Sequence, residues 1–140
     1  MPMKTVFKIK SNDIGLLAIR IAIGVLLPFH GIAKLIKGID WLNGLLAGIG
    51  LPTFIKYGVF IGEIIAPVLL LIGFRTRIAA MFVCINMFMA VLLAHRNEIF
   101  TIKPSGAYSI ELDALYFLGA LALVFMGGGR YSVSNKNKWD

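Results

Sequence analysis

The chain has 140 residues, of which 59% are hydrophobic, and it carries a formal net charge of +7 at pH 7. Soluble domains are usually nearer roughly 45–50% apolar, and this length leaves room for one domain, so we expect a single membrane domain over residues 1–140. Its basic residues lie in short segments between apolar runs, which indicates membrane topology and contact with lipid headgroups rather than nucleic-acid binding.

The composition excludes several kinds of redox and nucleotide chemistry. Cys84 is the single cysteine of the sequence, so neither an intrachain disulfide nor a dithiol relay can form. The sequence contains no ATP-binding or dinucleotide-binding glycine loop. Its six methionines are scattered and are typical of packing. We therefore expect no nucleotide cofactor and no metal site.

The first apolar run predicts a helix over residues 14–36, which is too long for a signal peptide. Arg20, His30 and Lys34 lie within it. Lys34 is near the end, where a lysine can snorkel to the membrane interface. For Arg20, snorkelling and a functional role both remain open. Between this helix and the next, residues 37–52 are apolar and rich in glycine, with Trp41 at the start of a helical pattern. They predict a short interfacial or re-entrant helix.

The second apolar run predicts a helix over residues 54–74, close to the roughly 20 residues that cross a bilayer. Glu63 lies in its middle. A carboxylate at that depth is costly and by default contacts a partner, a cavity or a ligand. Pro67, one turn later, loosens the helical hydrogen bonding, which favours a cavity lining.

Two further helices are predicted over residues 78–93 and 110–126, joined by a polar loop over 94–109 that begins with His95. Asn86, in the third helix, is typical of a side chain that hydrogen-bonds to a neighbouring helix. Glu111 and Asp113 open the fourth helix, where acidic residues favour the positive end of the dipole. The sequence thus predicts an all-α, polytopic membrane four-helix bundle.

The distribution of basic residues predicts the orientation of this bundle. One side carries Lys4, Lys8, Lys10, Arg75, Arg77, Arg130, Lys136 and Lys138, against Lys37, Lys56, Arg96 and Lys103 on the other. The excess places both termini in the cytoplasm. His30, His95, Glu111 and Asp113 then share the outer layer, Glu63 lies about 13 Å from the outer end of its helix, and Arg20 is deeper. This arrangement predicts an outward-opening polar cavity with Glu63 at its floor.

Several short segments resemble the DoxX family of small bacterial membrane proteins. They are Arg20 and Gly24, then FHGIAKL over 29–35, GLP over 50–52, Glu63, LLLIGF over 69–74, TRIAA over 76–80, YSIELDALY over 108–116 with Glu111, and GGGRYS over 127–132. The resemblance spans about residues 16–132. It implies a four-helix membrane bundle in the bacterial cytoplasmic membrane.

The resemblance also implies a function. Members of the family look like membrane subunits of quinone-linked oxidoreductases, such as thiosulfate:quinone oxidoreductase, or of complexes that handle oxidative and thiol stress. This chain lacks the cysteine pairs that sulfur chemistry would use. The chain also shows no redox centre of its own, so a quinone-binding subunit would receive its electrons from a partner protein. Whether the chain is an enzyme or a non-catalytic subunit stays open, and no catalytic residue is assigned.

Two hypotheses remain open from the residues themselves. In the first, a quinone headgroup binds Glu63 together with Arg20, His30 or Glu111, and Lys34, Asn86, His95 and Asp113 are secondary candidates. Haem ligation by His30 and His95 is a variant, although histidines near helix ends are more often interfacial residues. In the second, the chain is a non-catalytic scaffold or small-ligand carrier in which Glu63 and Arg20 are structural. Either protein would contact the lipid bilayer and partner subunits or further copies of itself.

Overall fold

The structure is a computed structural model that describes residues 3–140, with side chains from residue 12 onward. Its elements, in chain order, are α1 (Met3–Lys37), α2 (Leu42–Gly48), the 3-10 helix η1 (Thr53–Tyr57), α3 (Gly58–Phe60), the π-helical turn η2 (Ile61–Ile65), α4 (Ala66–Ile72), α5 (Thr76–Ala94), the 3-10 helix η3 (Arg96–Glu98) and α6 (Glu111–Met126).

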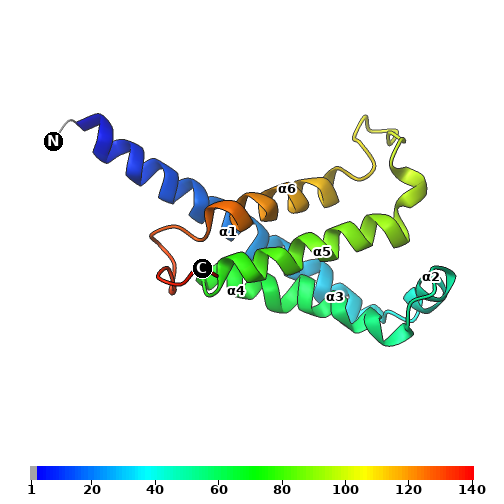
Figure 1. The fold of residues 1–140 in the computed structure, drawn as a ribbon. Helices are drawn as coiled ribbons and strands as arrows, with labels where there is room; N and C mark the ends of the chain where they lie inside the picture. The colour runs from blue at the N-terminus through cyan, green and yellow to red at the C-terminus, as the bar shows by residue number, and fades with distance from the viewer. Residues whose placement is uncertain (1–2) are drawn as a thin grey trace.

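Four long helical segments form the bundle (Figure 1). Three of them, Asn12–Lys37, Thr53–Ile72 and Thr76–Ala94, are long and apolar enough to cross a membrane. The fourth, α6, is 16 residues long and packs along α5. α1 contacts both α4 and α6 and so closes the bundle. The prediction of an all-α membrane four-helix bundle with a short helix after the first segment is confirmed.

The candidate membrane span of the first helix, Asn12–Lys37, agrees with the predicted range of 14–36 to within two residues. The helix itself is longer than predicted: α1 begins at Met3, and its first turns extend beyond the other helices (Figure 1). No glycine or proline separates residues 3–13 from the apolar run, so nothing in the sequence ends the helix there. The other three segments agree with the prediction to within two residues. The tight turn lies at Gly73–Arg75, where both of these residues adopt positive φ, and Thr76 already belongs to α5.

The core of the bundle is made of buried aliphatic side chains from all four segments, including Leu27, Leu70, Val83 and Leu123. One glycine permits a close contact between α1 and α4. A Cβ atom on Gly24 would lie 2.7 Å from Leu71 Cβ and 2.9 Å from the carbonyl oxygen of Pro67. Because only a glycine leaves that space, α1 can pack directly against the backbone of α4.

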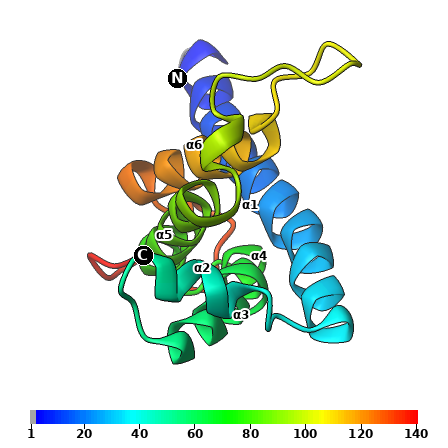
Figure 2. The same cartoon turned by 90° about the vertical axis from the view of Figure 1, so that its right-hand side faces the viewer.

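The two ends of the bundle carry different elements. α2 and η1 lie at the same end of the bundle as the loop that joins α5 to α6 (Figures 1 and 2). There the buried side chains of Ile39, Leu42 and Leu46 pack with Val59, Phe60 and Leu93. We call this end the α2 end. At the opposite end, residues 127–140 form a tail, which lies against the turn between α4 and α5. Backbone hydrogen bonds from Val133 N to Ile72 O (3.2 Å) and from Ser134 N to Gly73 O (3.1 Å) hold it there.

Candidate functional site

Glu63 lies on the π-helical turn η2, in the middle of the second membrane segment. Pro67, four residues further on, has no N–H to donate to the Glu63 carbonyl, and its ring crowds that carbonyl. The backbone therefore widens before the proline instead of continuing as a regular α-helix. Single π-helical turns of this kind occur often at functional sites. The proline in this run predicted the loosened backbone, and the structure gives it a definite form.

The carboxylate of Glu63 is buried, and one of its oxygens is held by two neighbouring helices. Lys34 Nζ from α1 lies 2.5 Å from Oε1, and Asn86 Nδ2 from α5 donates a hydrogen bond of 3.2 Å to the same atom. The Glu63 side chain is 3% exposed, and that of Lys34 is 26% exposed. The second oxygen, Oε2, is buried without a hydrogen-bond partner among the described residues. One oxygen is thus fixed by two side chains, and the other keeps its hydrogen-bonding capacity unused among the described residues.

Two glycines allow the helices to approach Glu63 this closely. A Cβ atom on Gly31 of α1 would lie 2.5 Å from Ile64 Cγ1 and 3.2 Å from the Glu63 carbonyl oxygen. A Cβ atom on Gly62 would lie 2.4 Å from Asn86 Cβ. Larger residues at these positions would push α1 and α5 away from η2. The absence of a side chain at Gly31 and at Gly62 therefore allows the short distances from Lys34 and Asn86 to the carboxylate.

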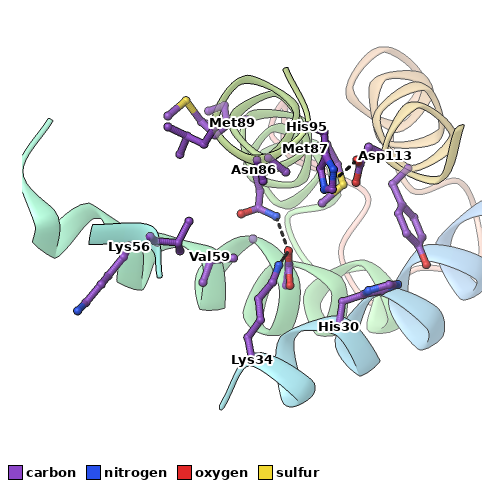
Figure 3. A pocket seen from close by; sticks show the side chains of 18 of the residues that line it. His30, Lys34, Lys56, Val59, Asn86, Met87, Met89, His95 and Asp113 are labelled. Carbon is purple, nitrogen blue, oxygen red and sulfur yellow. Dashed lines mark hydrogen bonds and ion pairs between the residues drawn. The ribbon is translucent and has the colours of Figure 1, made fainter. Parts of the chain in front are cut away.

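Glu63 opens into a pocket of about 850 Å³ that extends toward the α2 end (Figure 3). Most of its wall is apolar, with side chains such as Leu27, Leu42, Leu46, Phe82, Ile85 and Leu93. The polar and ionisable side chains of the lining are His30, Lys34, Lys56, Glu63, Asn86, His95, Lys103, Ser109, Asp113 and Tyr116. A largely apolar pocket with a few convergent polar groups is typical of small-molecule sites.

A second polar group lies where α5 ends and α6 begins. His95 Nδ1 is 3.1 Å from Glu98 Oε2, and His95 Nε2 is 3.8 Å from Asp113 Oδ2. On the facing helix, His30 packs edge-on against the ring of Tyr116, with 6.1 Å between the ring centroids. Figure 3 shows His95 and Asp113 pointing toward each other beside the pocket. We call His95, Glu98 and Asp113 the rim group.

Arg20 lies in a different part of the bundle and does not line the pocket. Its guanidinium is fully buried and donates hydrogen bonds to four backbone carbonyls: Leu70 at 2.8 Å, Leu71 at 3.1 Å, Gly128 at 3.1 Å and Tyr131 at 2.8 Å. Two of these carbonyls belong to the last turn of α4 and two to the tail. Arg20 therefore fastens the tail to the end of α4, and it forms no ion pair with Glu63 in the part of the chain that the structure describes.

The remaining sequence candidates divide between the pocket and the surface. His30, Lys34, Asn86, His95 and Asp113 all line the pocket with Glu63. Glu111 is exposed and is absent from the lining, so its position in the first turn of α6 leaves helix-end stabilisation as its role.

Four polar lining residues escaped the sequence reasoning, namely Lys56, Lys103, Ser109 and Tyr116. Lys56 pairs with the exposed Asp40 at 3.0 Å. Tyr116 follows Asp113 by three residues, so it lies on the same side of α6, and this helical spacing was the signal that could have found it.

The fold and this pocket define a polytopic helical membrane protein with a buried, partly satisfied carboxylate. The model of the DoxX family matches residues 15–96, and the chain belongs to that family.

Three curated proteins illustrate its relatives. "Putative oxidoreductase CatD" of Bacillus subtilis is 28% identical over 84% of this chain and 83% of its own length. An "Uncharacterized protein" of Haemophilus influenzae is 32% identical over 84% and 87%. An uncharacterized membrane protein of Mycobacterium tuberculosis is 26% identical over 86% and 79%. No solved structure matches the chain.

Proposed function

We propose that the pocket binds a quinone and that the protein is a membrane subunit of a quinone-linked oxidoreductase or oxidative-stress complex. The observation that carries the proposal is that Oε2 of the buried Glu63, on a largely apolar pocket, has no hydrogen-bond partner among the described residues. A buried carboxylate oxygen without a hydrogen bond is costly, because it loses its contacts with water and receives nothing in exchange. A ligand hydroxyl would supply the missing donor.

The donors and acceptors around Glu63 suit the two redox forms of a quinone. Lys34 and Asn86 are donors, and a ring carbonyl is an acceptor. In the reduced form, a ring hydroxyl can donate to Glu63 Oε2. The apolar walls suit the ring, and small-molecule sites of roughly 300–1,000 Å³ are common, a range that includes this pocket. When bound, a quinone would supply the transfer of two electrons together with two protons.

In this proposal the side chains of the pocket handle protons, and a partner redox protein exchanges the electrons. Glu63 can accept or return a proton at Oε2 while Lys34 keeps the other oxygen in place. His95 and Asp113 lie on the same pocket, near the end of the bundle, where they can exchange protons with water. The printed name of the Bacillus subtilis relative, an oxidoreductase, agrees with this proposal.

The proposal includes an orientation. Basic residues are more frequent at the tail end, which favours a cytoplasmic position for that end in a bacterial inner membrane. The pocket extends toward the opposite, α2 end and so opens outward. A lipid-soluble ligand would then meet Glu63 from the outer half of the bilayer.

Quinone binding can be measured on the purified protein. Trp41 lines the pocket, whereas Trp139 lies in the tail. In a Trp139→Phe background, a short-chain alkyl benzoquinone should quench Trp41 fluorescence in a saturable manner. Glu63→Gln should weaken this binding at least tenfold, while Glu111→Gln, an exposed position away from the pocket, should leave it unchanged. Equal affinity of the wild-type and Glu63→Gln proteins, both well folded, would refute the assignment.

One contact also supports the alternative function, a non-catalytic scaffold or small-ligand carrier. The ion pair between Lys34 and Glu63 already satisfies one carboxylate oxygen, as a purely structural pair would. A scaffold or carrier of this kind would contain no quinone when it is purified in mild detergent, and mass spectrometry of the extracted lipids distinguishes the two functions. An absorption spectrum of the same sample, after growth with added haem, tests ligation by His30 and His95.

A further inference from the structure

The loop between η3 and α6 contains a short hairpin over residues 99–110, which we call the 99–110 hairpin. Ile102 and Tyr108 form an antiparallel bridge. Backbone hydrogen bonds join Lys103 N to Ala107 O at 2.7 Å and Ser109 N to Thr101 O at 3.2 Å. The hydroxyls of Thr101 and Ser109 lie 2.8 Å apart. These contacts give the hairpin a fixed shape, so its side chains have fixed directions.

The two faces of this hairpin differ in character. Side chains alternate along an extended strand, so Ile102 points to the opposite side from Thr101 and Lys103, and Phe100 lies in the turn just before this strand. Lys103 and Ser109 line the pocket. Phe100 is 97% exposed and Ile102 is 72% exposed. The hairpin thus presents two large, mostly exposed apolar side chains on its outside.

The position of the hairpin indicates what covers these side chains. It lies at the α2 end and projects sideways, beyond the outline of the helices, when the bundle is viewed from that end (Figure 2). Trp41, Phe54 and Tyr57 are also exposed and belong to or adjoin α2 and η1 at this end. Exposed aromatic residues gathered at one end of a membrane bundle are typical of the layer at the level of the headgroups.

We propose that the 99–110 hairpin lies on the surface of the bilayer, with Phe100 and Ile102 inserted among the headgroups of the surrounding lipid. Phe100 and Ile102 lie at the same end of the bundle as the exposed aromatic residues Trp41, Phe54 and Tyr57, so all five can reach the same headgroup layer. A hairpin seated in this way holds Lys103 and Ser109 over the pocket. The proposal does not depend on which ligand the pocket binds.

Tryptophan fluorescence in reconstituted vesicles tests the proposal. The probe is Phe100→Trp in a background in which Trp41 and Trp139 are replaced by phenylalanine. Two matched probes give the limits: Phe88→Trp, at an exposed position in the middle of α5, for lipid, and Asn135→Trp, in the exposed tail, for water. The vesicles contain phosphatidylglycerol and phosphatidylcholine, with or without bromine atoms near the start of the acyl chains.

We expect brominated lipid to quench the Phe100→Trp probe at least twofold, as it should quench the Phe88→Trp probe, with little quenching by aqueous acrylamide. Quenching by acrylamide alone, as for the Asn135→Trp probe, would show that the hairpin stands in water and would overturn the proposal. Protection from both quenchers would also overturn the proposal, since it would indicate that protein and not lipid covers Phe100. A second copy of the chain is the protein that would do so in these vesicles. Dilution of the protein in the vesicles would reverse such protection.

Discussion

The carboxylate of Glu63 is bound by the ammonium of Lys34, at 2.5 Å, across the contact between η2 and α1. Arg20, a fully buried cation of the same helix, instead donates hydrogen bonds to backbone carbonyls of the tail and of the last turn of α4. The bundle therefore contains two separate buried polar centres. The first, at Glu63, lines the pocket and has one oxygen without a hydrogen-bond partner among the described residues. The second, at Arg20, holds the tail against the end of α4.

The pair formed by Lys34 and Glu63 should be strongly coupled. Lys34→Met leaves a buried carboxylate without its cation, and breaking such a pair costs about 3–5 kcal/mol when both groups are fully buried. The Lys34 side chain is 26% exposed, so we expect a value at or below the lower end. Thermal unfolding in detergent measures this loss of stability. Combining Lys34→Met with Glu63→Gln should restore part of it. Strictly additive losses would mean that the two groups are not coupled.

Arg20 should matter for stability but not for ligand affinity. Hydrogen bonds from a charged donor contribute about 1.5–3 kcal/mol each, and the planar fork of arginine reaches four carbonyls that a lysine cannot reach together. Arg20→Lys should therefore lower the unfolding temperature and speed hydrogen exchange at the amides of Val133 and Ser134, which bind the turn after α4. Quinone quenching of Trp41 should stay unchanged in the folded protein. Weaker quinone binding in a folded Arg20→Lys protein would place Arg20 in the ligand site.

The sequence predicted the helices well because each is a long apolar run, but it did not predict which charged side chains meet. Lys34 lies near the end of α1, where snorkelling is the simplest expectation, yet the close contact at Gly31 brings it onto Glu63. Arg20 meets carbonyls of a glycine-rich tail more than 100 residues away in the chain, a contact that no helical spacing encodes. Depth along a helix can be counted from a sequence, but the direction of a side chain depends on how the helices rotate and pack.

The close approach of α1 and α4 makes Gly24 intolerant of a side chain. An alanine there would place its Cβ 2.7 Å from Leu71 Cβ and 2.9 Å from the Pro67 carbonyl oxygen, so the helices must separate. Overpacking of this kind costs about 1–3 kcal/mol. Gly15 is the control, since it lies in the same helix and a Cβ atom added to it would have no neighbour within 4 Å. Gly15→Ala should be neutral or stabilising by up to about 1 kcal/mol. Thermal unfolding of the two variants measures the contrast, and equal effects would contradict the close contact.

Asp140 should make the docking of the tail depend on pH. A hydrogen bond from the Ser134 hydroxyl, helped by the backbone N–H groups of Asn137 and Lys136 and by Arg75, holds the pKa of the Asp140 side chain below its ordinary value. A lowered folded pKa means that this stabilisation is present above about pH 3.9, the unfolded value, and is lost as the pH falls through the folded pKa. Trp139 fluorescence should report release of the tail under those acidic conditions. Ser134→Ala should shift the release to higher pH, and an unchanged midpoint would exclude the hydroxyl as the main cause.

The orientation of the bundle can be tested by cysteine labelling in a Cys84→Ala background. Eight basic residues lie at the tail end or in the segment before α1's membrane crossing, against four at the α2 end, so the tail should face the cytoplasm. Thr76 is unsuitable as a reporter because it is fully buried, and a cysteine there would not react from either side. Ser105, on the 99–110 hairpin, and Asn135, in the tail, are both exposed. In intact cells, a membrane-impermeant maleimide should label Ser105→Cys and leave Asn135→Cys unmodified until the membrane is broken. The reverse labelling pattern would show that the bundle has the opposite orientation in the membrane, with the pocket around Glu63 open to the cytoplasm.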